Sequence, residues 1–423
     1  MEKLEFPRVG EQMYHQVLDN GLHIFVVPKP GFQKSYAFFA TNYGGMDMKF
    51  KLDGQDMDTP AGVAHYLEHK MFDTKEGNAL QELAANGASP NAFTSNAITG
   101  YYFESTEKFE ENLRILLSFV SIPYFTKESV DKEQGIIGQE IGMIEDDPDW
   151  VVFMDLMQAL YEKHPVRVSV AGSHITAETL YACHKAFYDP SNMVLCVAGD
   201  VDPEKICQAA REILPERPGA PVARGDYGAQ EPAEVCQPMI QREMEVSVPL
   251  FQLGFKGEAA PEGEGALRQQ LLGELACEAL LGNSGPLYAR LYREGLVNRN
   301  FSYGYESYPG CAFLCAGGES KDPEGVRAAV AAEAERIARE GIDPELWERL
   351  KKSSYGNRVR ALNSFEHICI SQAQSFFQGC DFLRFPEVYD SLTREDAQAM
   401  IARWVTPERT ALSVVRPREE AVE

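Results

Sequence analysis

Hydrophobic and polar positions in the first half of the chain switch repeatedly between strand-like and helix-like spacing. Apolar or alternating segments predict strands at residues 22–27, 36–41, 92–95, 101–104 and 193–198. Recurrence at helical spacing predicts helices at residues 61–72, 78–86, 107–121, 127–145, 150–162 and 176–187. Pro148 and Pro190 mark two helix boundaries.

The second half repeats this order of elements. Strands are predicted at residues 246–255, 301–306, 312–316 and 411–415. Helices are predicted at residues 264–281, 286–293, 322–339, 343–375 and 393–403. Each half therefore runs strand, helix pair, strand pair, several helices and strand, which indicates a weak internal duplication.

The two halves are separated by a segment of about 25 residues that is rich in Pro, Gly and Ala and has little periodicity. A chain of 423 residues is also long for a single hydrophobic core. We therefore predict an α/β (α+β) protein with two similar domains, at residues 1–215 and 241–423, joined by a linker at 216–240.

Composition and charge narrow the possible partners and compartment. The formal net charge of -24 argues against binding to nucleic acid or to anionic membranes. Such a charge is usually a solvated surface, although acidic walls that attract basic peptides are an alternative. The nine cysteines are scattered and odd in number, which predicts reduced thiols. With no apolar leader and no run of about 18 apolar residues, a cytoplasmic location is expected.

The sequence pattern that most clearly indicates a chemical function is an HxxEH pentad at residues 65–69. On a helix, His65 and His69 fall on one face about a turn apart, so both imidazoles can reach one metal ion, with Glu68 beside them. This order is the inverted zincin signature. The alternative is a core helix with two hydrogen-bonded histidines. Lys70 is interpreted as a solvated charge on the back of the helix.

A catalytic zinc site needs a third protein ligand and one open position. Glu133 and Glu140 lie two helical turns apart and share a face with Ile136 and Ile137. Both carboxylates could instead point to solvent. Local spacing also leaves four other acidic residues open as ligands: Glu128, Glu145, Asp146 and Asp147.

Five blocks of sequence, in order, resemble the M16 (pitrilysin/insulysin-type) metallopeptidases, and above all their small two-domain bacterial processing-protease-like members. The blocks lie at residues 18–23, 62–72, 89–95, 133–141 and 187–193. The resemblance implies that each domain is a mostly antiparallel sheet packed with helices. It also implies that the two domains form half of a clam-like chamber.

The resemblance further implies roles for the residues of the pentad and of the 133–141 block. His65, His69 and Glu140 would bind Zn²⁺, and Glu68 would act as the general base. Glu133 would hydrogen-bond a ligand histidine. The corresponding helix of the second half, within residues 271–286, contains no histidine, so one Zn²⁺ per chain is expected.

The resemblance also implies substrate contacts, which match the family well in the first half of the chain and poorly in the second. The segment Asn91, Ala92, Phe93 and Thr94 matches the edge strand on which the family binds peptides by strand addition. In the second half the family places an Arg and, seven residues later, a Tyr that stabilise the scissile carbonyl. Here Arg293 and Tyr303 are the nearest residues of these types, at a different spacing.

The expected function is that of a zinc endopeptidase acting on peptides or unfolded segments. The irregular Arg and Tyr spacing favours a chain that works as a homodimer or with a homologous subunit that lacks the zinc motif. The alternatives are a non-catalytic or partner-dependent subunit, and a metal-dependent hydrolase of another substrate class. The edge strand argues against the last, because strand addition recognises a polypeptide backbone.

Overall fold

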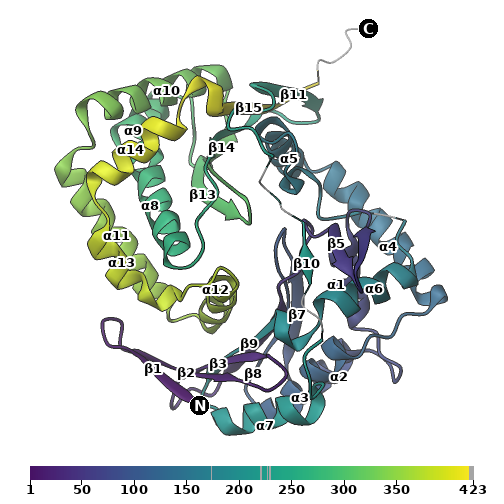
Figure 1. The fold of residues 1–423 in the computed structure, drawn as a ribbon. Helices are drawn as coiled ribbons and strands as arrows, with labels where there is room; N and C mark the ends of the chain where they lie inside the picture. The colour runs from purple at the N-terminus through teal and green to yellow at the C-terminus, as the bar shows by residue number, and fades with distance from the viewer. Residues whose placement is uncertain (173, 220–221, 226, 228–229, 419–423) are drawn as a thin grey trace. The chain divides into compact units, whose positions relative to one another are not determined.

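The computed structural model describes residues 1–418 apart from 173, 220–221, 226 and 228–229 (Figure 1). Its internal contacts divide the chain into two compact units, each made of three segments. Unit 1 contains Met1–Ile141, Ser169–Gly225 and Val359–Arg384, and unit 2 contains Gly142–Val168, Asp226–Arg358 and Phe385–Glu423. The predicted linker at 216–240 divides the sequence into two halves, and each unit takes one segment from the other half. Unit 1 includes Val359–Arg384, and unit 2 includes Gly142–Val168. The predicted domain limits stay a prediction.

Unit 1 contains a seven-stranded sheet and a second, three-stranded sheet. The large sheet has the order β1 (Glu2–Phe6), β2 (Glu11–Val17), β3 (His23–Pro28), β9 (Met193–Gly199), β4 (Ser35–Thr41), β8 (Thr99–Ser105) and β7 (Ser89–Thr94). The small sheet has the order β10 (Ala223–Arg224), β5 (Lys49–Leu52) and β6 (Gln55–Asp58). The helices are α1 (Val63–Met71), α2 (Ala79–Ala85), α3 (Phe109–Ser121), α4 (Lys127–Glu145), α6 (Ala177–Phe187), α7 (Pro203–Ile213) and α12 (Phe365–Phe377).

Strand β4 shows why this sheet is stable, since every one of its residues is buried. Ala37 and Phe39 join the hydrophobic core formed with α1, α3, α6 and α7. The opposite face is covered by α12, which packs on β4 and β9 and places Phe376 edge-on to Phe25 of β3 at 5.5 Å. In Figure 1, α12 and the pair α3 and α7 lie on opposite sides of this sheet. Burial on both faces accounts for the nearly continuous apolar sequence of the central strands.

Unit 2 is built on a five-stranded sheet. Its order is β11 (Met239–Met244), β15 (Thr410–Pro417), β12 (Leu250–Gly257), β14 (Cys311–Glu319) and β13 (Ser302–Tyr308). Its helices are α5 (Pro148–Leu160), α8 (Glu264–Leu281), α9 (Pro286–Arg293), α10 (Pro323–Glu340), α11 (Pro344–Ala361), α13 (Phe385–Ser391) and α14 (Arg394–Trp404). Gly254 of β12 faces Leu156 of α5, whereas Gly257 faces Trp404 of α14. The strand therefore alternates between two helical layers.

The two units share one topology. Strands β3-β9-β4-β8-β7 and β11-β15-β12-β14-β13 appear in the same order along the sheet and along the chain. In both sets the first pair is parallel and the other pairs are antiparallel. Helix α8 packs on edge strand β13 as α1 packs on edge strand β7. The predicted fold class, two similar and mostly antiparallel α/β units, is confirmed.

Several predicted elements differ from the structure. The single helix predicted at residues 343–375 is wrong, because Ser364 accepts a hydrogen bond from the His367 amide and starts α12 as a new helix after α11. The strand predicted at 246–255 begins only at Leu250, directly after Pro249. Strands β1, β2, β5, β6, β10 and β11 and helices α7 and α13 have no counterpart in the prediction.

Two further observations concern the chain as a whole. None of the nine cysteines, all of which lie in the described part of the chain, forms a disulfide. Among the described residues, no helix combines the length and the apolar character that crossing a bilayer requires.

Candidate metal centre

Helix α1 starts at a glycine that the local backbone requires. Gly62 precedes the first helical residue and has φ 88°, in the left-handed region that disfavours side chains. A Cβ atom on Gly62 would also lie 2.2 Å from the backbone nitrogen of Gly172. Gly62 thus allows the chain to turn into α1 against the 169–172 segment, and so positions the pentad.

We expect Gly62→Ala to lower the free energy of unfolding by about 2 kcal/mol, from the left-handed φ and the backbone clash together. Gly138→Ala is the matched control, because a Cβ atom on Gly138 of α4 meets no atom within 4 Å. That change should stabilise the chain by about 0.5–1 kcal/mol through helix propensity. Thermal unfolding midpoints of both proteins test this, and a Gly62→Ala protein as stable as the wild type would contradict it.

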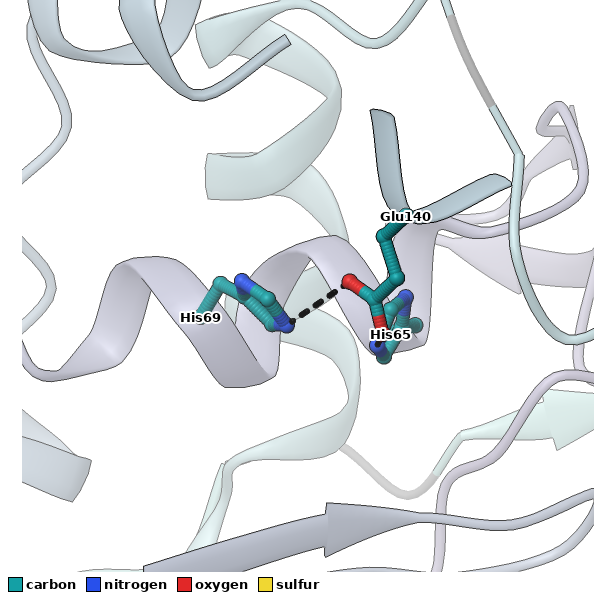
Figure 2. A group of neighbouring side chains, drawn as sticks. All are labelled: His65, His69 and Glu140. Carbon is teal, nitrogen blue, oxygen red and sulfur yellow. Dashed lines mark ion pairs between the residues drawn. The ribbon is translucent and has the colours of Figure 1, made fainter. Parts of the chain in front are cut away.

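Three potential ligand atoms converge between α1 and α4. Glu140 Oε1 lies 3.6 Å from His65 Nε2, and Glu140 Oε2 lies 3.6 Å from His69 Nε2 (Figure 2). One ligand atom from each residue lies within 4.8 Å of the others. Zn–N and Zn–O bonds of about 2.1 Å in a tetrahedron separate ligand atoms by about 3.4 Å. The donor set and its spacing therefore fit a zinc ion with an open fourth position.

The other acidic residues that local spacing left open do not join this group. In the part of the chain that the structure describes, His65, His69 and Glu140 are the one set of three or more His, Cys, Asp or Glu side chains with metal-binding spacing. The alternative that Glu133 and Glu140 both point away to solvent is wrong, because each has a carboxylate oxygen within 3.6 Å of a pentad histidine.

Glu133 contacts His69 on the side away from Glu140. Its Oε1 lies 3.2 Å from His69 Nδ1, which donates, so His69 Nε2 remains free to face Glu140. This hydrogen bond raises the pKa of His69, and it lowers the pKa of Glu133. The geometry is that of a carboxylate that fixes a ligand tautomer, as metal-binding histidines usually require.

The environment of His65 differs from that of His69. Burial, followed by the proximity of His69, lowers the pKa of His65, which favours the neutral imidazole that a metal needs. Its Nδ1 is buried and makes no hydrogen bond with the described residues. No described protein group therefore fixes the tautomer of His65 in the way that Glu133 fixes that of His69.

Glu68 lies beside the three potential metal ligands and is held by a hydroxyl that the sequence did not reveal. Thr94 Oγ1 donates to Glu68 Oε2 at 2.7 Å. Burial raises the pKa of Glu68, while the Thr94 hydrogen bond opposes that rise. Thr94, predicted only as a substrate contact, thus links the edge strand β7 to the acid of the pentad.

The interpretation of Lys70 as a solvated charge is wrong. Its side chain is only 2% exposed. Its Nζ forms an ion pair with Asp73 and lies 3.9 Å from Glu133 Oε2. The Lys70 ammonium thus faces Asp73 and, on α4, the Ser129 carbonyl and Glu133, and not solvent.

Strand β7 is an edge strand, as the substrate-binding role requires. It pairs with β8 on one side, Asn91 opposite Tyr102, and it ends the order of the sheet. Asn91 is exposed and its Oδ1 accepts from the Ala92 amide at 2.9 Å. Phe93 stacks on Phe38 with ring centroids 5.8 Å apart. Contacts of these side chains with a peptide stay a prediction.

Arg293 and Tyr303 belong to unit 2, whereas the pentad belongs to unit 1. Arg293 is exposed in the last turn of α9. The hydroxyl of Tyr303 on β13 donates to Glu278 Oε2 of α8 at 3.2 Å. Their predicted contact with the scissile carbonyl stays a prediction.

Known proteins resemble this chain over its whole length. The family model for insulinase (peptidase family M16) matches residues 54–174, and that for the peptidase M16 inactive domain matches residues 174–354. The uncharacterized zinc protease YmfH of Bacillus subtilis is 36% identical, over 99% of this chain and 100% of that protein. A second Bacillus subtilis relative, the uncharacterized zinc protease YmxG, is 23% identical over 74% of this chain and 77% of that protein.

Solved structures share the fold. The crystal structure of a protein described as an M16-like peptidase from Alicyclobacillus acidocaldarius has a TM-score of 0.92 and 32% identity, over 98% of this chain and 100% of that one. A protease from Helicobacter pylori has a TM-score of 0.81 at 17% identity, over 96% of this chain and 100% of that one, which shows the fold alone.

Proposed function

Because this chain belongs to the M16 family of peptidases, we propose that it is a zinc-dependent endopeptidase that hydrolyses peptides or unfolded segments. The observation that supports this most strongly is the convergence of His65, His69 and Glu140 beside Glu68. These residues offer two imidazoles, one carboxylate and an adjacent base, which is the donor set of a hydrolytic zinc site.

The proposed chemistry assigns one task to each residue. His65, His69 and Glu140 would hold the zinc ion, which when bound would supply the Lewis acidity that lowers the pKa of water towards about 7 and polarises a peptide carbonyl. Glu68 takes a proton from the attacking water and passes it to the leaving amine. Glu133 keeps His69 in the tautomer whose Nε2 can ligate.

Peptide binding is proposed on strand β7. Its outer edge offers backbone N–H and C=O groups that have no partner strand in the described sheet. A peptide added there would run alongside Thr94, whose hydroxyl holds Glu68. Main-chain pairing accepts many sequences, so we propose broad side-chain tolerance.

We also propose that the chain acts as a dimer, with itself or with a homologous subunit that lacks the pentad. The support is the irregular spacing of Arg293 and Tyr303, together with the involvement of Tyr303 in a hydrogen bond to Glu278. A partner could supply the groups that stabilise the scissile carbonyl.

The experiment is metal analysis of the purified protein combined with digestion of a peptide library. We expect about one zinc per chain, cleavage that stops after chelation, and cleavage that returns when zinc alone is restored. A protein that binds no zinc, or that cleaves equally well after chelation, would refute the proposal. Efficient cleavage by the isolated monomer would refute only the partner requirement.

Removing the Thr94 hydroxyl should slow catalysis without weakening peptide binding. In Thr94→Val the carboxylate of Glu68 loses its 2.7 Å hydrogen bond and gains rotational freedom. We expect kcat to fall on the order of 10-fold, with KM and zinc content unchanged, because β7 keeps its main-chain groups. Thr94→Ser keeps the hydroxyl and should restore most of kcat. Equal kcat values for the Val, Ser and wild-type proteins would show that this hydroxyl has no positioning role.

A further inference from the structure

The residue after the second ligand histidine is a buried cation. Lys70 is among the largest fully buried side chains of the chain, at 1% relative exposure. Burying an ammonium group is costly unless oppositely charged and hydrogen-bonding groups surround it. The groups around its Nζ therefore identify the interactions that stabilise the buried charge.

These groups come from the turn after α1 and from α4. Asp73, just beyond α1, forms an ion pair with Lys70 and is itself 39% exposed on its side chain. The backbone oxygen of Ser129 in α4 accepts from Nζ at 3.4 Å. Glu133 Oε2, also in α4, lies 3.9 Å from Nζ. Lys70 thus connects the helix that holds two metal ligands to the helix that holds the third.

Glu133 divides its two oxygens between Lys70 and a ligand. Oε2 faces the ammonium, and Oε1 accepts from His69 Nδ1 at 3.2 Å. The terminal torsion of a glutamate is broad and has no strong intrinsic preference. Attraction of one oxygen by Lys70 restricts that torsion and keeps the other oxygen aimed at His69.

Helix α4 has few apolar contacts to hold it in place. Its buried residues are Val130 and Ile137. Gly135, Gly138 and Gly142 lower its helix propensity, and a Cβ atom on any of them would meet nothing within 4 Å. Partly buried Ile141 adds one apolar contact with the core. Polar links also attach the helix: the Tyr66 hydroxyl of α1 donates to the Val130 carbonyl, and Gln134 Nε2 donates to the Ile175 carbonyl at 2.8 Å.

We propose that Lys70 is a positioning residue of the metal site: it orients Glu133, which in turn orients His69. This inference rests on the zinc site of the proposed function. If Lys70 served only to pair with Asp73, its loss would not affect zinc affinity through Glu133. The proposed role predicts that it does.

The test is zinc affinity, measured by competition with a chromophoric chelator, in a double-mutant cycle. We expect Lys70→Met to weaken zinc binding by about 10-fold, in the range found when the partners of ligand histidines are removed. In a Glu133→Gln background the same change should alter zinc affinity by less than about 2-fold, since the residue through which it acts is already lost.

Asp73→Asn is the matched control. It removes the local ion pair but leaves Lys70 facing Glu133, so zinc affinity should stay within about 2-fold of the wild type. If Lys70→Met does not fold, Lys70→Gln, which keeps a donor at the end of the side chain, replaces it in the cycle. Wild-type affinity in the Lys70 variant, or an equal loss in Asp73→Asn, overturns the inference while leaving the zinc site intact. A wild-type chain that binds no zinc overturns the proposed function and this inference with it.

Discussion

Glu68→Gln is expected to lower kcat for peptide cleavage by about 10³-fold while the protein keeps its zinc. The amide has nearly the shape of the carboxylate and can still accept the hydrogen bond from Thr94 Oγ1. It cannot take a proton from water at neutral pH. His65, His69 and Glu140 are unchanged, so the loss belongs to proton transfer and not to metal binding.

The measurement is kcat on a peptide selected from the library digest, with zinc content determined on the same preparation. Glu76→Gln is the control, since Glu76 is an exposed glutamate shortly after α1 and lies outside the ligand group. Its kcat should equal that of the wild type. Retention of most activity in Glu68→Gln would refute the assignment of Glu68 as the general base.

The part of the metal site that the sequence predicts is the part fixed by local geometry. His65 and His69 are four residues apart on one helix, so their common face follows from helical geometry alone. The position of α4 relative to α1 is a tertiary property. Spacing therefore could not choose Glu140 over Glu128 or Glu145, and only the resemblance to a family selected it.

The same distinction explains what the sequence did not reveal. The bond from Thr94 to Glu68 joins a strand to a helix 26 residues away, and a threonine in a strand has no local signal for such a partner. Lys70 was predicted as solvated because a lysine is almost never fully buried unless it is paired. Its partners Ser129 and Glu133 lie about 60 residues further along the chain.

The elements of the fold that the sequence predicts are likewise those with a local signal. Central strands such as β4 were predicted because burial on both faces leaves an apolar sequence. Strands β5 and β6 alternate charged residues with few apolar ones and have largely exposed burial patterns, so they resemble loops. The duplication was visible in the order of elements, because each unit needs the same elements to build the same sheet.

Glu140→Gln is expected to weaken zinc binding by about 100-fold or more, since losing an outer partner of a ligand already costs 10- to 100-fold. Glu140 is the one ligand on α4, and the side chain is 38% exposed beside the open glycines Gly138 and Gly142. The zinc-free variant should therefore unfold at the same temperature as the zinc-free wild type. Added zinc should raise the unfolding temperature of the wild type by more than that of the variant. A ligand stabilises the folded state by RT ln(1 + [L]/Kd), so a 100-fold larger Kd removes up to about 2.7 kcal/mol of this stabilisation.

Glu145→Gln provides the comparison on the same helix, because Glu145 is exposed and lies outside the ligand group. It should bind zinc and gain stability from zinc as the wild type does. The measurements are chelator competition and thermal unfolding with and without zinc. If Glu140→Gln bound zinc as tightly as Glu145→Gln, the third ligand would have to come from another residue. The two histidines of α1 would then remain the only assigned part of the site.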